Sequence, residues 1–307
     1  MTVFVQLIRL RHWIKNLFVF APLIFSLRFL DPSSLWRSTL TFLAFCLSSS
    51  GVYIFNDIVD RDEDRRHPRK QHRPLAAGRI SVALAAVVGV GLVAAAAGLS
   101  AMLDPRVALV LAMYLGINVA YSLALKRVVI LDVMIVAFGF LLRVSAGGFC
   151  IGVPVSNWML LTTLFLSLFL GFGKRRMDTA PGRAGVPLQG RASPGRAASP
   201  GGRALQRYGA RVLDYLVVIC LTLTIMTYSL YAVGAQTVQK LGTDRLVVTV
   251  PLVVFGLFRY LYLVYRKKKG GNPVEVFLGE PVILVAIALW AAAVIAVLLS
   301  ARGHGLS

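Results

Sequence analysis

Nine long stretches of mostly apolar residues restrict what this 307-residue chain can fold into. A helix needs about 20 apolar residues to cross roughly 30 Å of hydrocarbon, and the stretches are near that length. In lipid, only helices and closed barrels satisfy every backbone polar group, and these stretches lack the two-residue alternation of barrel strands. We therefore expect an all-α integral membrane protein, a bundle of about nine transmembrane helices. The expected spans, of which the first is short and dips rather than simply crossing, are 17–30, 36–56, 82–103, 106–124, 129–151, 157–174, 212–234, 246–265 and 280–300.

Lysine and arginine are distributed unevenly between the two sides of the expected membrane. If odd-numbered spans run outward from the cytoplasm, the inner segments, with Lys174 at the edge of one, hold 25 of the 33 Lys and Arg residues. The outer segments hold six. Because cytoplasmic loops carry such an excess, the distribution predicts a multi-pass protein of the cell (inner) membrane. Its amino terminus would lie inside and its carboxyl terminus outside.

The same distribution accounts for the net charge of +20. Cations at the inner face meet anionic lipid headgroups and anionic substrates. No module that reads nucleic acid is visible, so we expect anionic membrane lipid and no nucleic acid among the partners. The sequence leaves the oligomeric state open, with a homo-oligomer as one option.

Two further features concern the organisation of the chain. All but two inner connections are short, so we expect one membrane domain, 1–307. The longest connection, 179–203, is rich in Gly, Pro, Ala and Arg without periodicity, which predicts a disordered cytoplasmic loop. Cys46, Cys150 and Cys220 are isolated within apolar stretches, and we interpret them as packing residues.

The stretch NDIVDRDEDRRHPRKQHRPLAAG (56–78) holds five of the thirteen acidic side chains. On a continuous helix leaving the second span, Asn56, Asp57, Asp60 and Asp64 share one face about 100° wide. Like charges this close repel unless a cation lies among them. Proteins usually hold Mg²⁺ through one or two carboxylates and substrate phosphates. The cluster therefore predicts Mg²⁺ bound by Asp57, Asp60 and Asp64, together with a diphosphate.

The residues around this cluster allow alternatives. Glu63 falls at the edge of the acidic face, whereas Asp62 points away from it. A solvated, charged helix end is the simpler interpretation, although such ends usually mix signs. The cations that follow are either the positive-inside signal alone or include a phosphate contact, for which Arg73 is a candidate.

Other polar side chains are expected at the same face of the membrane. They precede the first span, close the fourth, open the fifth and end the sixth. For the basic ones, anchoring at the membrane surface is the simpler alternative to substrate binding. The residues are Lys15, Asn16, Asn118, Tyr121, Lys126, Asp132, Lys174 and Arg175.

Arg143 lies within the fifth span, eleven residues after Asp132. On a helix this places it about 16 Å deeper and near the same face. Because a charge at that depth is costly, it should face a polar central cavity or a partner. The sequence does not separate a ligand contact from a buried ion pair that fixes helix packing.

The motif NDxxDxxxD resembles that of the UbiA-type prenyltransferase superfamily, nine-helix membrane enzymes that bind a diphosphate through Mg²⁺. Within it, the chain most resembles the decaprenyl-phosphate phosphoribosyltransferase branch, through RHWIKNLFVFAPL, HRPLAAG, YSLALKRVVILDV, GFLLRVSAGG and GKRR. Members that prenylate aromatic rings usually carry a second acidic cluster, where this chain has Lys126 and a single Asp132. The chain departs from the family by lacking the proline of an RPxxW-like opening and by its Gly/Pro/Arg-rich loop after GKRR.

The resemblance implies Mg²⁺-dependent transfer of 5-phosphoribose from phosphoribosyl diphosphate to a polyprenyl phosphate, in a cavity open to the cytoplasm. Asp57, Asp60 and Asp64 would hold the metal, Asn56 would fix one oxygen or a metal-bound water, and Lys126 would neutralise the leaving diphosphate. The remaining substrate contacts would come from Lys15 and Arg73 at phosphates, Asp132 at a ribose hydroxyl or as an orienting group, Lys174 and Arg175 at the lipid phosphate, and Asn16, Asn118, Tyr121 and Arg143.

Two other functions remain open at this point. A prenyl transferase acting on an aromatic or other acceptor would use the same first motif. A lipid carrier or transporter would instead predict inverted halves with interrupted helices at corresponding positions, and no such repeat is visible.

Overall fold

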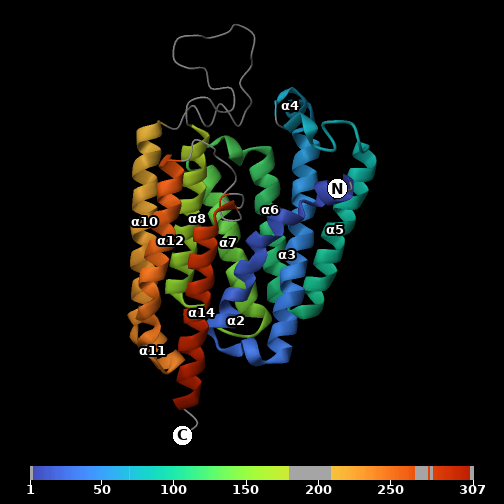
Figure 1. Cartoon of the computed structure of the whole chain (residues 1–307). Helices are drawn as coiled ribbons and strands as arrows, with labels where there is room; N and C mark the ends of the chain where they lie inside the picture. Colours follow the sequence, from blue (N-terminus) through green and yellow to red (C-terminus); the bar gives the residue numbers. More distant parts are fainter. Residues whose placement is uncertain (1–2, 69, 180–208, 267–275, 277–278, 305–307) are drawn as a thin grey trace.

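The computed structural model describes residues 3–68, 70–179, 209–266, 276 and 279–304, and within these ranges all regular elements are helices. Among the described residues, eight helices are long and apolar enough to cross a membrane, which confirms the all-α membrane fold. Their axes are roughly aligned, and the helices pack side by side in one bundle (Figure 1). They are α3 (Pro32–Val59), α5 (Val82–Leu103), α6 (Pro105–Leu123), α7 (Leu131–Cys150), α8 (Asn157–Asp178), α10 (Ala210–Val233), η5 (Arg245–Thr249) continued by α12 (Val250–Arg266), and α14 (Pro281–His304).

Short elements connect and flank these spans. α1 (Val3–Ile8) precedes the first apolar stretch, and α4 (Arg61–Arg66) and η3 (Lys70–His72) follow α3. η4 (Leu125–Arg127) joins α6 to α7, and α11 (Ala235–Leu241) joins α10 to η5. The predicted disordered loop, apart from Thr179, lies outside the described residues.

The first apolar stretch differs from the other spans because it is broken. It comprises η1 (Leu10–Phe20), α2 (Ala21–Phe25) and η2 (Arg28–Leu30). Residues with left-handed backbone precede two of its parts: Arg9, with φ 58°, comes before η1, and Leu27, with φ 61°, comes before η2. Arg9 pairs with Asp57 near the end of α3, whereas Arg28 precedes the start of α3 by four residues. The broken stretch therefore runs along α3 in the opposite direction.

At the end of the bundle where α3 and α6 begin, capping residues visible in the sequence fix the helix starts. Asp31 accepts hydrogen bonds from the backbone N–H groups of Ser33 and Ser34 at the start of α3. Asp104 caps α6 in the same way, and proline follows both aspartates. Aspartate at the cap with proline at the first helical position is a strong helix-starting combination, because proline removes an N–H that has no partner there.

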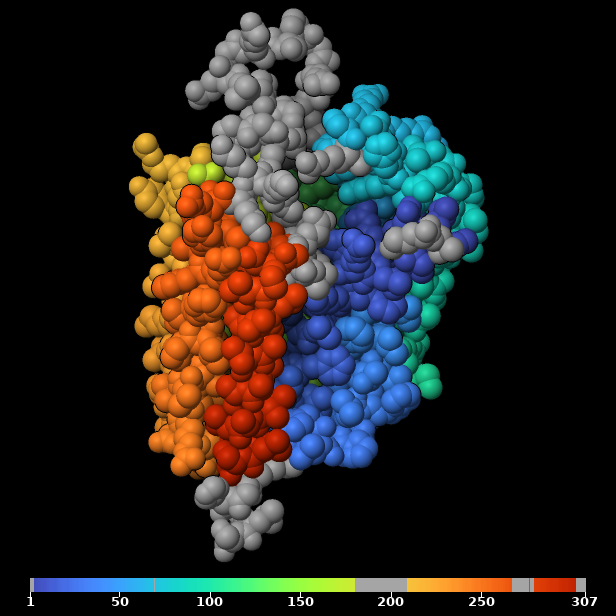
Figure 2. All heavy atoms as spheres, in the orientation of Figure 1, coloured from blue at the N-terminus to red at the C-terminus, as the bar shows by residue number. Residues whose placement is uncertain are grey.

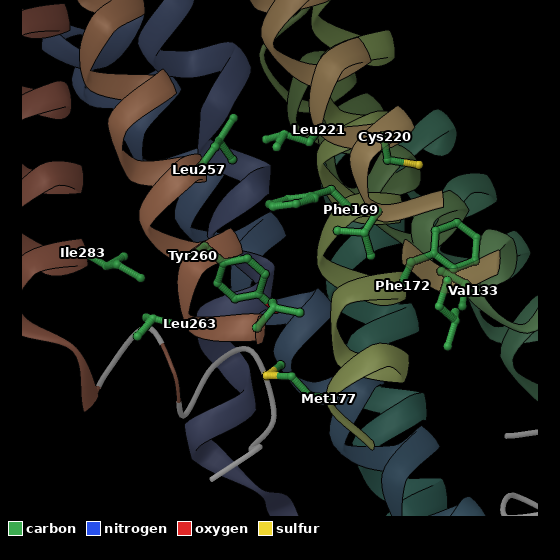
Figure 3. Packing of buried hydrophobic residues seen from close by; sticks show 13 residues of the cluster. Val133, Phe169, Phe172, Met177, Cys220, Leu221, Leu257, Tyr260, Leu263 and Ile283 are labelled. Carbon is green, nitrogen blue, oxygen red and sulfur yellow. The ribbon is translucent and has the colours of Figure 1, made fainter. Parts of the chain in front are cut away.

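The largest described apolar cluster lies among α7, α8, α10, α12 and α14. Phe169 of α8 meets the Tyr260 ring of α12 at 5.3 Å between centroids, and Val133 and Leu257 close the cluster (Figure 3). On the face seen in Figure 2, α12 and α14 lie side by side, next to the amino-terminal part of the chain. The predicted packing role of the three cysteines is confirmed, since all are buried and free.

Close contact between η1 and α7 depends on Gly147. A Cβ atom at this position would lie 2.0 Å from the backbone carbonyl oxygen of Val19. Real side chains do not approach a carbonyl this closely, so any larger residue would push η1 away from α7. Glycine here allows the broken stretch to reach the centre of the bundle.

Gly147→Ala is expected to lower the stability of the protein by about 3 kcal/mol, because the clash is with backbone and cannot be relieved by a side-chain rotation. The apparent melting temperature of the purified protein in detergent measures this loss. Gly116→Ala is the matched control, since α6 leaves open space around that position. Equal melting temperatures for the two variants would contradict the close η1–α7 contact.

Candidate functional site

The acidic motif lies where α3 ends, at one end of the bundle near α4 (Figure 1). The expectation of one continuous helix through the motif is wrong: α3 ends at Val59 and α4 begins at Arg61. Asp60 stands between them with φ −92° and ψ 7°. The interruption is confined to this residue, because the Asp60 N–H still donates to the Asn56 carbonyl oxygen and the Asp64 N–H to that of Asp60.

Asp57 and Asp64 are nonetheless brought together, by a shared cation. Arg73 Nη1 lies 3.1 Å from Asp57 Oδ1 and 2.6 Å from Asp64 Oδ2. Arg9 also donates to Asp57 Oδ1, and Lys70 Nζ lies 3.4 Å from Asp64 Oδ1. Both carboxylates are almost fully buried, at 2% and 1% exposure. Buried carboxylates need such partners, because an unpaired charge away from water is costly.

Asp60 faces α6 and the turn after it. Its Oδ1 accepts from Lys126 Nζ at 2.6 Å, and both side chains remain partly exposed. One turn earlier, the Asn56 amide oxygen accepts a hydrogen bond from Ser122 of α6. The lysine that replaces the second acidic cluster therefore lies directly against the first one.

The flanking acids behave as the helical spacing indicated. Asp62 is 85% exposed and makes only a long contact of 3.7 Å to Arg65. Glu63 is partly buried, and burial raises the pKa of its carboxyl, with Asp60 and Asp64 adding to the rise. Glu63 thus belongs to the edge of the acidic site and Asp62 does not.

A second ion pair joins α7 and α8 near Lys126. Arg175 Nη2 lies 2.7 Å from Asp132 Oδ2, and Asp132 is fully buried. Tyr121 of α6 lies beside this pair. Asn118 donates its side-chain amide to the carbonyl oxygen of Tyr114 in its own helix, 2.7 Å away.

Cations also converge on the start of η1. Burial lowers the pKa of His12 to about 4, and the positive charges of Lys15, Arg9, Lys174 and Arg73 lower it further. The imidazole is therefore neutral near pH 7. Burial, with Arg143 and Arg9 nearby, lowers the pKa of Lys15 to about 8. A neutral histidine among four cations indicates a strongly positive region that an anion would stabilise.

Arg143 is held by neutral groups rather than by a carboxylate. It donates from Nε to Asn16 Oδ1 at 2.7 Å, from Nη1 to the Gly139 carbonyl at 2.6 Å and from Nη2 to the Tyr114 hydroxyl at 3.1 Å. The rings of Phe45, Tyr114 and Phe140 surround its guanidinium at 4.7–5.6 Å. No carboxylate pairs with it among the described residues, so the alternative of a buried ion pair is not what these residues show.

Asn16 is drawn into the same network and is fully buried. Its amide nitrogen lies 3.2 Å from Cys46 Sγ and 3.3 Å from Ser49 Oγ of α3. Asn16 therefore ties η1 to α3 and α7, one residue after Lys15. The sequence placed it at the membrane face, and the structure places it in the interior because Arg143 and α3 supply its hydrogen bonds.

Sequence reasoning missed Arg9 at this site, and it gave no particular contact to Lys70, one of the cations after the acidic motif, or to Ser122, one of the polar residues that close the fourth span. Lysine and arginine before the first span are ordinary positive-inside residues, and only the left-handed turn at Arg9 aims its side chain at Asp57. Ser122 lies four residues before Lys126, and this helical spacing is the one signal that could have linked it to Asn56.

The assembled site combines both signs of charge. Three carboxylates, of Asp57, Asp60 and Asp64, face four cations. Lys70, Arg73 and Lys126 lie 2.6–3.4 Å from them, and Arg9 pairs with Asp57. Within the described ranges, no group of three acidic, histidine or cysteine side chains is arranged to hold a metal ion by itself, so a cation here would need oxygen ligands from a substrate as well. Acids that can share a divalent cation, beside cations that can bind phosphate oxygens, suit a metal-bound diphosphate.

Sequence comparison agrees with this chemistry. A family model described as the UbiA prenyltransferase family matches residues 17–279. The chain is 30% identical over 295 residues to a decaprenyl-phosphate phosphoribosyltransferase of Mycobacterium tuberculosis, covering 94% of this chain and 92% of that protein. It is 30% identical over 292 residues to the enzyme of the same name in Corynebacterium glutamicum, covering 93% and 83%.

The fold is similar to that of a UbiA homolog from Archaeoglobus fulgidus, solved bound to DMAPP and Mg²⁺. The TM-score is 0.70 at 18% identity, and the match covers 97% of this chain and 99% of that one. The match shows that the two proteins share one fold over nearly their whole lengths. Family model, relatives and fold agree: this chain is a member of the UbiA prenyltransferase family, an integral membrane enzyme of the transferase class.

Proposed function

We propose that this chain transfers 5-phosphoribose from phosphoribosyl diphosphate to a polyprenyl phosphate in a Mg²⁺-dependent reaction that releases diphosphate. The observation that carries the proposal is the contact of Lys126 Nζ with Asp60, 2.6 Å apart. A lysine in place of a second acidic cluster leaves one set of acids for one metal-bound diphosphate. Its ammonium group adds a positive charge that can neutralise the diphosphate. The relatives that share most of the chain's length are named decaprenyl-phosphate phosphoribosyltransferases, which supports the same reaction.

The acidic residues fit a divalent cation. Asp64 Oδ1 is buried and accepts no hydrogen bond from the residues that the structure describes, although Lys70 lies 3.4 Å away. Asp57 and Asp64 already share one positive group, Arg73. Asp57, Asp60 and Asp64 would hold Mg²⁺, with Asn56 orienting an oxygen ligand. The ion would supply charge neutralisation at the diphosphate.

The remaining residues stabilise the leaving group. Displacing diphosphate from the anomeric carbon builds negative charge on its oxygens, and fixed cations in a partly buried site stabilise that charge. Lys126 and Arg73 lie beside the acids and are placed to bind these oxygens. Arg9 and Lys15 add positive charge from η1. Breaking the carbon–oxygen bond is then easier because the leaving oxygen is neutralised as it departs.

The acceptor needs orientation more than activation. A polyprenyl phosphate is already ionised near neutral pH, so no general base is required. Lys174 and Arg175, at the end of α8, are the residues we assign to its phosphate. Asp132 holds Arg175 and thereby orients it, or binds a ribose hydroxyl. Asn118 and Tyr121 lie on the same side of the site as this pair. The hydrogen bond from Arg143 to Asn16 holds η1 against α7.

Orientation follows from the same assignment. The site and the amino terminus would face the cytoplasm, on the side where lysine and arginine are concentrated, and the carboxyl terminus would lie outside. The cations near α4, η3 and η4 would then contact anionic lipid headgroups of the inner leaflet.

Labelled donors test the reaction directly. Membranes containing the protein are expected to transfer label from phosphoribosyl diphosphate to a polyprenyl phosphate, and to lose this activity when a chelator removes Mg²⁺. Activity should return when Mg²⁺ is added back. Membranes without the protein are the control.

The same assay separates the alternatives. Transfer from a labelled prenyl diphosphate to an aromatic acceptor, without use of phosphoribosyl diphosphate, would replace the proposal with the prenyl transferase function. Uptake or release of lipid without covalent transfer would point to a carrier.

A further inference from the structure

A second polar cavity opens at the end of the bundle opposite the acidic site. Its volume is about 270 Å³, and it lies where α3 and α6 begin and α7 ends. Ser34 lines this cavity, and Asp57 lies 23 residues later on the same helix, about 35 Å away at 1.5 Å per residue. That length matches the thickness of a bilayer's hydrocarbon core and part of its interface, so the cavity lies at the other membrane surface.

Three arginines and two aspartates line the cavity: Arg28, Arg37, Arg106, Asp31 and Asp104. The aspartates are already committed to local contacts. Asp31 accepts from the Ser34 hydroxyl and backbone, which holds the pKa of its carboxyl below the usual value. Asp104 accepts a bidentate pair from Arg106 at 3.0–3.1 Å. One arginine is thus neutralised by its neighbour.

The other two arginines keep their charge available. Arg37 donates to the carbonyl oxygens of Cys150 and Leu103, and Arg28 donates to the carbonyl oxygen of Ile151. These contacts use Nε and Nη2 of Arg37 but only Nη1 of Arg28. Among the described residues, neither arginine lies within ion-pair distance of a carboxylate, although the charge of Arg28 acts on Asp31 and that of Arg37 on Asp104. With three arginines against two aspartates, the cavity keeps a net positive charge. Arginine N–H groups in this number suit the oxygens of a phosphate.

The surroundings of the cavity are those of a lipid-facing surface. Leu30, Leu35 and Met102 are 57%, 46% and 87% exposed, and each lies within four residues of a lining aspartate. Trp36, 63% exposed, follows on α3. Exposed apolar side chains beside a tryptophan are typical of the region where acyl chains meet headgroups. A ligand in this cavity would therefore have a charged end inside it and an apolar body outside.

We propose that this cavity binds the phosphate group of an anionic phospholipid from the leaflet opposite the acidic site. The headgroup phosphate contacts Arg28 and Arg37, and the acyl chains lie against Leu30, Leu35 and Trp36. A water occupies about 30 Å³ in the liquid, so the cavity is large enough for a phosphate group rather than for one or two waters. The site is separate from the transfer reaction and does not depend on it.

Native mass spectrometry of the detergent-solubilised protein, titrated with phosphatidylglycerol, tests the proposal. The unmodified chain is expected to retain one phosphatidylglycerol, and Arg28→Gln to weaken that binding at least about fivefold, because each arginine near an anionic headgroup contributes substantially. Arg37→Gln should weaken it similarly. Arg245→Gln is the matched control, since this exposed arginine begins η5 just after α11 at the same end of the bundle (Figure 1).

Folding and ligand source are checked in parallel. Arg37 donates to carbonyl oxygens at the ends of α5 and α7, so its replacement can destabilise the fold. Elution volume and melting temperature are therefore compared for every variant. If Arg37→Gln is unstable, lipid retention by Arg28→Gln alone tests the proposal. Equal retention by Arg28→Gln and Arg245→Gln would overturn the proposal. So would displacement of the lipid by an equal concentration of inorganic phosphate, which would indicate a free anion. Equal retention of diacylglycerol, which lacks phosphate, would also contradict it.

Discussion

Asp60→Asn and Asp57→Asn are each expected to lower Mg²⁺-dependent release of diphosphate by about 100- to 1,000-fold, because each removes a charge that stabilises the metal-bound leaving group. The substitution keeps the size of the side chain. Asp60 is partly exposed, so its replacement should leave the fold intact. Diphosphate release with labelled phosphoribosyl diphosphate and purified protein measures the effect.

Asp62→Asn is the matched control for both variants. It removes the same charge from the same motif, but its side chain is 85% exposed and lies away from the site. Its rate should stay close to that of the unmodified chain. Full turnover by Asp60→Asn would contradict the metal assignment. An equal loss of activity in Asp62→Asn would show that the effect comes from the change in net charge and not from the position of the carboxylate.

Lys126→Gln is expected to lower the rate of transfer by about 100-fold, because it removes the cation that neutralises the leaving diphosphate. The loss should appear mainly in kcat, since the charge it stabilises develops as the bond breaks. Steady-state kinetics with saturating Mg²⁺ separates kcat from KM.

Arg127→Gln serves as the control for Lys126. Arg127 is the next residue in η4, carries the same charge and is exposed, and no ion pair to it is formed among the described residues. Its kinetics should change by less than about twofold, as expected for a surface charge. Unchanged kcat in Lys126→Gln would remove the observation on which the proposed function rests.

The fold was largely predictable because lipid imposes a simple rule. Eight of the expected spans correspond to the long helices, since backbone groups in hydrocarbon must be satisfied within the segment. The first stretch was predicted as short and dipping. Its division into η1, α2 and η2 depends on contacts with α7, above all the approach that Gly147 allows, and no local pattern encodes that approach.

The site was predictable in its composition but less so in its pairing. Helical spacing indicated that Asp57 and Asp64 belong together and that Asp62 does not, and the structure agrees. The same spacing was wrong about a continuous helix: α3 ends just before Asp60, and Asp60 pairs with Lys126 from the segment after α6. Arg9 was missed, since its pairing with Asp57 joins segments 48 residues apart.

The sequence alone determined which segments enter the membrane, where acids and cations gather, and which family motif they form. These properties depend on transfer of side chains between water and lipid and on spacing within one helix, and both are local. The tertiary structure decided which cation meets which carboxylate and that Arg143 is held by neutral groups. It also gathered three arginines and two aspartates in a cavity at the far surface. Such pairings depend on distances between helices that are remote in sequence, which only the packed bundle fixes.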